Sequence, residues 1–113
     1  MPMSFRLTRA ATADLARILA HSRRRFGVAA AIDLRRRVFD RLAALQAVPL
    51  SGRVPPELED FGDERLREVV LTPHRVFYLA EPPEPLLVFA IADGRRDLAE
   101  LLIQRALTLP RTH

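Results

Sequence analysis

Five polar residues in the second half of the chain are of the types that metal-free RNA cleavage requires. Such cleavage needs a base for the 2′-hydroxyl, cations that stabilise the phosphorane, and an acid for the leaving oxygen. Glu57 is the candidate base, and His74 or Tyr78 is the candidate acid. Arg67 and Arg75 are the candidate phosphate ligands, because a guanidinium group matches two phosphate oxygens at once. A loop carboxylate, a turn histidine and a half-buried aromatic remain the alternative interpretation of the same positions.

Three short apolar strands and a preceding loop must position these side chains. The strands are expected near 66–72, 75–81 and 86–92, separated by a tight turn at 72–74 and by a Pro-rich connection. Connections this short predict an antiparallel meander. The loop at 49–64 is long for a compact domain, which is typical of functional segments but also fits a plain connector.

The first half of the chain predicts one strand and two helices. A strand at 4–7 leads into a helix at 9–25, for which Thr8 is the expected N-cap. Gly27 is expected to end that helix, and a second helix follows at about 29–47. Residues spaced by three or four predict the buried face of each helix: Leu15, Ile18, Leu19 and Ser22 in the first, and Ala31, Leu34, Val38, Leu42 and Leu45 in the second.

A final helix is expected at about 95–107, capped by Asp93, with 108–113 as a loose tail. The whole pattern predicts one α+β domain over 1–113 in the order β-α-α-β-β-β-α. A helical hairpin would pack on one face of a small, mainly antiparallel sheet. The opposite face would be only partly covered, which would leave a groove.

Composition narrows the classes of function. All eighteen basic residues are arginine, and the formal charge is +4, with a pI near 11.1. This charge favours an acidic partner or a nucleic acid, whereas the complete absence of lysine is typical of a GC-rich genome. There is no cysteine and the three histidines are scattered, so we expect neither a disulfide framework nor a metal site. No signal peptide or membrane-spanning stretch is apparent, so we expect a cytoplasmic bacterial protein.

Several consecutive segments resemble one toxin superfamily over nearly the whole chain. They are Ala11-Thr12-Ala13-Asp14-Leu15-Ala16-Arg17-Ile18, Gly52-Arg53-Val54-Pro55-Pro56-Glu57, Arg67-Glu68-Val69-Val70, Pro73-His74-Arg75-Val76-Phe77-Tyr78 and Gly94-Arg95-Arg96-Asp97-Leu98. In this order they resemble the RelE/ParE toxins of bacterial type II toxin–antitoxin modules, which include plasmid-stabilisation systems, and the ParE branch most closely.

The ParE resemblance implies a growth-arresting toxin that traps DNA gyrase on cleaved DNA and needs no cofactor. It makes five arginines target-binding or structural groups: Arg53, Arg67, Arg75, Arg95 and Arg96. A structural ion pair of Arg67 with Asp93 or Asp97 is the alternative role for that side chain.

The RelE branch implies a different activity, which is ribosome-dependent cleavage of messenger RNA. In that case Glu57, Arg67, His74, Arg75 and Tyr78 would form the active site. His74 departs from the family pattern, which often has tyrosine there, so it either adds an acid or replaces a packing aromatic. A third interpretation is a degenerate toxin that only binds its antitoxin.

Membership of either branch implies a cognate antitoxin, and with it a toxin–antitoxin hetero-oligomer. Solvent-side positions of the second helix are the candidate antitoxin surface: Val28, Ile32, Arg35 and Phe39. Ordinary core packing is the alternative for the apolar members. The arginine runs at 23–25 and 35–37 are either a basic contact surface or solvated faces with local pairs such as Asp33 with Arg37.

Overall fold

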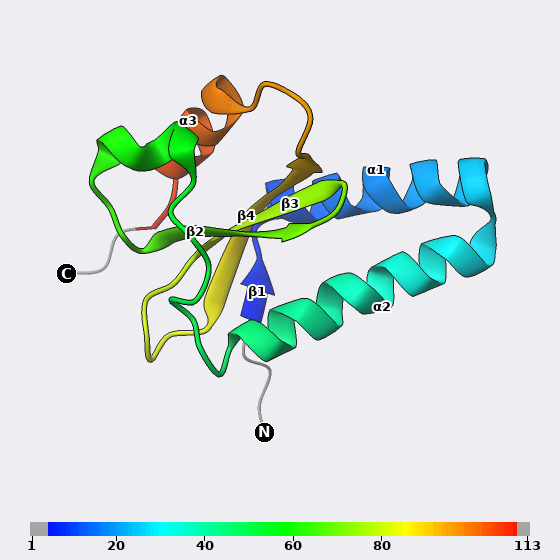
Figure 1. Cartoon of the computed structure of the whole chain (residues 1–113), viewed down its shortest axis with the longest axis horizontal. Helices are drawn as coiled ribbons and strands as arrows, with labels where there is room; N and C mark the ends of the chain where they lie inside the picture. Colours follow the sequence, from blue (N-terminus) through cyan, green and yellow to red (C-terminus); the bar gives the residue numbers. More distant parts are fainter. Residues whose placement is uncertain (1–4, 111–113) are drawn as a thin grey trace.

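The computed structural model describes residues 5–110, and its elements follow the predicted order (Figure 1). The elements are β1 (Phe5–Leu7), α1 (Arg9–Phe26), α2 (Val28–Leu45), the 3-10 helix η1 (Pro56–Phe61), β2 (Leu66–Leu71), β3 (His74–Leu79), β4 (Leu86–Asp93) and α3 (Ala99–Leu107). The loop expected at 49–64 therefore contains a helical turn. Ser4, expected in the first strand, lies outside the described residues.

Local chemistry sets the bounds of the helical hairpin. The Thr8 hydroxyl accepts a hydrogen bond of 3.1 Å from the amide of Ala11, which satisfies one of the free N–H groups of the first turn of α1. Gly27 has φ +97° and separates the two helices. A residue with a side chain is strained at that φ, so glycine permits the immediate turn from α1 into α2. Both predictions are confirmed.

The sheet has the strand order β1-β4-β3-β2. The strands β2, β3 and β4 form the predicted antiparallel meander, and β1 pairs with β4 in parallel. The register of β3 on β4 shifts between Phe77 and Tyr78. Since Phe77 lies opposite Ala90 and Tyr78 opposite Val88, the extra residue belongs to β4.

Each face of the sheet carries its own hydrophobic core. The hairpin of α1 and α2 covers one face, while η1 and α3 lie on the other (Figure 1). The second core includes Leu58 of η1 and Leu102 of α3, both with no exposed surface. The opposite face is thus covered by η1 and α3, and a hollow of about 910 Å³ lies on the hairpin side of the sheet. A smaller hollow of about 400 Å³, lined in part by Leu79 and Leu87, lies on the η1 and α3 side of the sheet, where the groove was expected.

An ion pair completes the edge of β4 beyond the end of β1. There, the amide of Ile91 donates to the Asp14 carboxylate at 3.0 Å, and the Phe89 carbonyl accepts from Arg105 at 3.0 Å. Asp14 and Arg105 also bond to each other. Side chains from α1 and α3 therefore replace the missing neighbouring strand, since unpaired backbone groups are costly to bury.

The final helix begins four residues later than expected. Asp93 ends β4, and its carboxylate accepts from the backbone amide of Arg95 at 2.9 Å instead of capping a helix. Asp97 makes the corresponding bond to the amide of Ala99, where α3 starts. The prediction that Asp93 caps the final helix was wrong, because residues 94–98 form a non-helical connection that places Leu98 in the second core. Leu109 is also buried, so the expected loose tail is anchored there; residues 111–113 lie outside the described residues.

Candidate functional site

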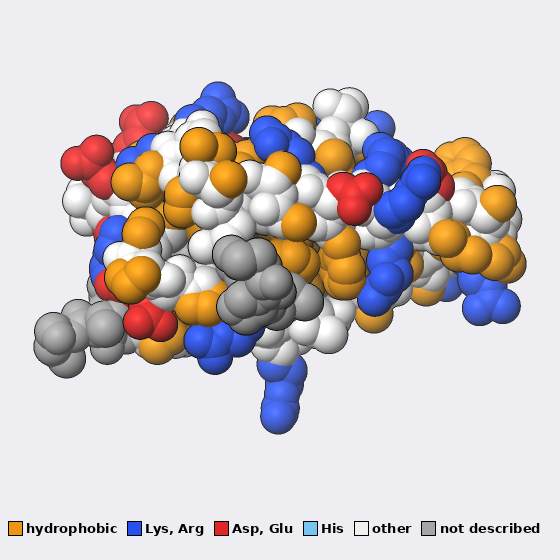
Figure 2. All heavy atoms as spheres, turned by 90° about the horizontal axis from the view of Figure 1, so that it is seen from below, with side chains coloured by type: hydrophobic (Ala, Val, Ile, Leu, Met, Phe, Trp, Pro, Cys, Tyr) orange, Lys and Arg blue, Asp and Glu red, His pale blue; other side chains and the backbone are white. Residues whose placement is uncertain are grey.

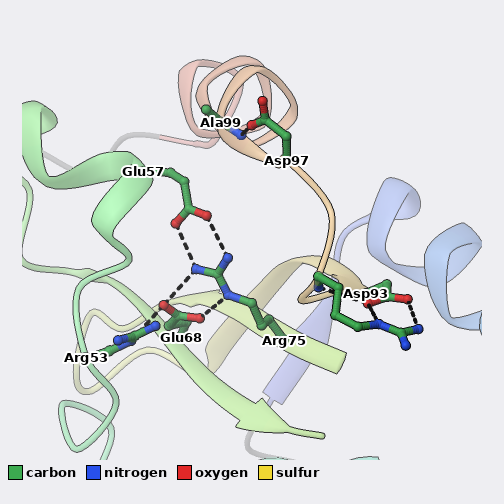
Figure 3. Close-up of polar contacts among 8 residues, drawn as sticks. Arg53, Glu57, Glu68, Arg75, Asp93, Asp97 and Ala99 are labelled. Carbon is green, nitrogen blue, oxygen red and sulfur yellow. Dashed lines mark hydrogen bonds and ion pairs between the residues drawn. The ribbon is translucent and has the colours of Figure 1, made fainter. Parts of the chain in front are cut away.

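Two arginines and two glutamates form one connected cluster on the η1 side of the sheet (Figure 3). Arg75 of β3 donates to Glu57 of η1 through both terminal nitrogens, at 2.6 and 2.7 Å. Its Nε and Nη2 donate to Glu68 of β2 at 2.6 and 2.9 Å. Arg53 donates to the same Glu68 carboxylate at 2.9 Å. The charges alternate along the cluster and cancel.

Burial makes this cluster structural in character. The Glu68 side chain has no exposed surface and that of Arg75 is 11% exposed. The hydrogen bonds from Arg75 hold the pKa of Glu57 below its ordinary value, although partial burial opposes them. The bonds to Glu57 and Glu68 raise the pKa of Arg75. Glu57 therefore lies in its ionised form with both oxygens occupied by Arg75.

Two neighbours shape the path of the Arg75 side chain. Its guanidinium carbon lies 4.9 Å from the centroid of the Phe77 ring. A Cβ at Gly94 would lie 2.8 Å from two carbons of the Arg75 stem. Gly94 therefore has a packing role at the start of the Gly-Arg-Arg-Asp-Leu segment, since any side chain would collide with Arg75.

Tyr78 and Arg67 lie on the hairpin side of the sheet and fix the loop before η1. Tyr78 is fully buried, and its hydroxyl accepts a bond of 3.1 Å from the amide of Gly52. Burial raises the pKa of Tyr78. Arg67 donates to the carbonyls of Leu50, Gly52 and Glu64. The alternative ion pair of Arg67 with Asp93 or Asp97 is not formed, because these backbone carbonyls take the Arg67 donors and Asp93 pairs with Arg95.

His74 lies away from both groups, in the wall of the hollow on the hairpin side of the sheet. We call this hollow the hairpin pocket: about 910 Å³ between α1, α2 and the ends of β3 and β4. The His74 Nδ1 atom is buried and has no hydrogen-bond partner among the described residues. Burial lowers the pKa of His74, and the nearby Asp93 carboxylate opposes that shift. The imidazole is therefore predominantly neutral near pH 7.

The five candidate nuclease residues are not brought together. Arg75 and Glu57 lie on the η1 side of the sheet, whereas His74 and Tyr78 belong to the hairpin side. Neighbouring residues of a strand point to opposite faces, so His74 and Arg75 cannot serve one phosphate from β3. The alternation of side chains along a strand would therefore have shown, from the sequence alone, that His74 and Arg75 lie on opposite faces.

The other candidate residues are mostly exposed. The Arg53 and Arg95 side chains are 62% and 78% exposed, although each has a carboxylate partner. Arg96 is exposed and, like Arg95, lines the hairpin pocket. On α2, Val28 and Ile32 are 55% and 64% exposed.

Phe39 differs from these exposed positions because it packs partly into the core. Its ring contacts Phe5 edge-on, with centroids 5.7 Å apart, and the Arg35 guanidinium carbon lies 4.4 Å from its centroid. The predicted pair of Asp33 with Arg37 is confirmed at 3.0 Å.

Sequence reasoning missed the buried acids Glu68 and Asp14, which hold the arginine contacts together. An acidic residue at a position of apolar spacing was the available signal for both, because a buried carboxylate needs a cationic or N–H partner. Among residues 5–110, no group of three or more His, Cys, Asp or Glu side chains is placed to hold a metal ion. No helix of that range is long and apolar enough to span a membrane.

A family model matches most of this chain, and a solved structure shares its fold. Residues 5–98 match the family described as the ParE toxin of the type II toxin–antitoxin system parDE. Among solved structures, the chromosomal ParDE toxin–antitoxin system from P. aeruginosa is similar, with a TM-score of 0.62 and 23% sequence identity. The alignment covers 80% of this chain and 95% of that chain. The chain matches no curated protein at a significant level.

Proposed function

Because the chain belongs to the ParE toxin family of type II toxin–antitoxin systems, we propose that it arrests bacterial growth by binding DNA gyrase. A cognate antitoxin would neutralise it by forming a hetero-oligomer. The observation that carries this proposal is the family match over 5–98, joined to the ion pairing of Arg75. An arginine held by two glutamates is poorly placed to receive a phosphate, so it favours binding over RNA cleavage.

The target-binding arginines then fall into two groups. Arg67 and Arg75 hold the segment 50–57 against the sheet, since their donors are taken by carbonyls and carboxylates of the chain. Arg53, Arg95 and Arg96 have exposed side chains. We assign direct contact with gyrase to these three and a positioning role to the first two.

The antitoxin surface in this proposal is the outward stripe of α2, formed by Val28, Ile32, Arg35 and Phe39. Residues at this spacing share one side of a helix. Val28 and Ile32, at the N-terminal end of this stripe, are exposed aliphatic side chains, whereas Phe39 at its other end packs against Phe5 of β1. An amphipathic helix or an extended segment fits such a stripe, because its apolar side chains would cover Val28 and Ile32.

Induction of the chain alone in a bacterial host, with two parallel readouts, tests this function. One readout is plasmid supercoiling together with gyrase–DNA cleavage complexes, and the other is primer extension across translated transcripts. We expect growth arrest, relaxed plasmid, trapped gyrase and intact messages. Codon-phased cuts with normal supercoiling would instead establish ribosome-dependent cleavage, which requires Glu57 to leave Arg75. Absence of any growth defect would indicate a degenerate toxin.

A further inference from the structure

The positive charge of this protein is concentrated at one end of the helical hairpin. Residues 23–37, which we call the hairpin end, contain six arginines and one aspartate, a net charge of +5. The whole chain carries +4, so the other residues together are slightly acidic. The hairpin projects beyond the sheet in Figure 1, and blue side chains lie among orange ones at that end in Figure 2. A surface of this kind attracts acidic partners over distances of about 8 Å in physiological salt.

Contacts within the chain account for only part of this charge. Asp33 is the one acid in this stretch, and it bonds to Arg36 and Arg37. The run at 23–25 lies in the last turn of α1, where cations interact favourably with the free carbonyls. The run at 35–37 lies in the interior of α2, where that benefit is absent. Folding alone therefore does not explain why both runs are arginine.

Exposed apolar side chains occur in the same stretch. Phe26, Val28 and Ile32 are 70%, 55% and 64% exposed, and Gly27 joins the two helices between them. The Arg25 guanidinium carbon lies 6.0 Å from the centroid of the Phe26 ring. Exposed aromatic and aliphatic groups beside arginines are typical of the centre of a protein–protein interface, where arginine and aromatic residues are enriched.

We infer that the hairpin end also holds gyrase, in addition to the contacts assigned to Arg53, Arg95 and Arg96, and that it does so through an acidic protein face with an apolar centre. This inference rests on the proposed function and adds the contact surface to it. A protein fits better than DNA, because a phosphate backbone offers nothing apolar to Phe26 and Ile32. Three successive arginines on a helix also fan over roughly 200°, which suits a cleft that encloses the tip better than a flat strand of phosphates.

The same surface would also explain how the antitoxin neutralises the toxin. Val28 and Ile32 belong both to the hairpin end and to the antitoxin stripe of α2. An antitoxin bound along that stripe would cover the apolar centre of the gyrase contact. Binding of the two partners is then mutually exclusive, and the toxin is released when the antitoxin is removed.

Purified gyrase and four point variants test the inference. Arg24→Glu and Ile32→Gln alter the hairpin end. Arg9→Glu and Leu107→Gln are the matched controls: Arg9 lies at the other end of α1, about 22 Å away by helix rise, and Leu107 on α3 is 63% exposed. All four positions are exposed, so each change should alter the stability by no more than about 1 kcal/mol, the largest change being expected for Arg24→Glu at the C-terminus of α1. Thermal unfolding of each variant verifies this.

The readout is the protein concentration that halves gyrase supercoiling. We expect Arg24→Glu and Ile32→Gln to raise it by about tenfold or more, and the controls to leave it within about twofold of wild type. If wild type inhibits gyrase and the hairpin-end variants inhibit equally well, the inference is overturned and the proposed function stands. If wild type does not affect gyrase, both are overturned. Binding of wild type to duplex DNA alone, abolished by Arg24→Glu, would overturn the protein-contact assignment.

Discussion

Substitution of Arg75 by methionine separates a structural arginine from a catalytic one. Arg75→Met keeps an unbranched apolar stem but removes the guanidinium group and its four hydrogen bonds to Glu57 and Glu68. Glu57, whose side chain is 19% exposed, can turn toward water. Glu68 has no exposed side-chain surface and would be left with Arg53 alone. The main cost is therefore an incompletely compensated buried carboxylate.

The magnitude follows from that burial. Removing one partner of a buried ion pair costs about 3–5 kcal/mol, because the remaining charge has lost its compensation. With a urea dependence of about 2 kcal/mol/M for a domain of this size, a loss of about 4 kcal/mol lowers the unfolding midpoint by about 2 M. Arg96→Met is the control, because Arg96 is exposed, and its midpoint should change by no more than about 0.3 M.

Urea unfolding followed by far-UV circular dichroism measures both variants. The double variant Arg75→Met/Glu68→Gln adds a second check, since removing the buried charge should recover part of the loss, with a coupling of about 0.5–3 kcal/mol. A midpoint for Arg75→Met close to that of wild type would refute the structural assignment. That result, joined to loss of transcript cleavage in cells, would move Arg75 into a nuclease site.

Three further predictions concern the loop, the β4 edge and the pocket histidine. Gly52→Ala places a methyl 2.3 Å from the Tyr78 hydroxyl and 2.6 Å from the Glu68 carbonyl; we expect a loss of about 1–3 kcal/mol from overpacking, and thermal unfolding no different from wild type would contradict this. Asp14→Ala removes the acceptor of the Ile91 amide and the partner of Arg105. We expect the free energy of unfolding to fall by about 3–5 kcal/mol and the Ile91 amide to exchange its hydrogen faster. Slow exchange at that amide would show that another acceptor replaces Asp14. Burial lowers the pKa of His74 from 6.5, so below about pH 6.5 the unfolded chain binds a proton that the native chain does not. The contribution of neutral His74 to the free energy of unfolding is therefore complete above about pH 6.5 and is lost as the pH falls toward the lowered pKa of the folded chain. His74→Gln should flatten the fall of the unfolding free energy between pH 7 and 5, and an unchanged slope would exclude His74 as its source.

Local signals in the sequence predicted most of the fold. Thr8 and Gly27 act within a few residues of their own positions, so their roles as cap and helix terminator followed directly from residue type. The antiparallel meander followed from short connections. The cap assigned to Asp93 failed because a distant requirement, burial of Leu98 against the second core, decides where α3 begins.

The candidate site was less predictable because its partners come from separate segments. Glu57, Glu68 and Arg75 meet only when η1 lies across β2 and β3, and nothing local in the sequence fixes that position. The division of His74 and Arg75 between two faces could have been predicted from strand alternation. The concentration of charge at residues 23–37 could also be counted from the sequence, but the exposure of Phe26 and Ile32 required the structure.

The most direct test of the central claim is a cleavage assay with purified toxin, gyrase, ATP and supercoiled plasmid. Detergent and protease added at the end release any DNA that gyrase holds in a cleaved state. We expect linear plasmid that increases with toxin concentration and requires gyrase. Supercoiling at the normal rate with no linear product, from protein that still arrests growth and cuts translated messages, would contradict it.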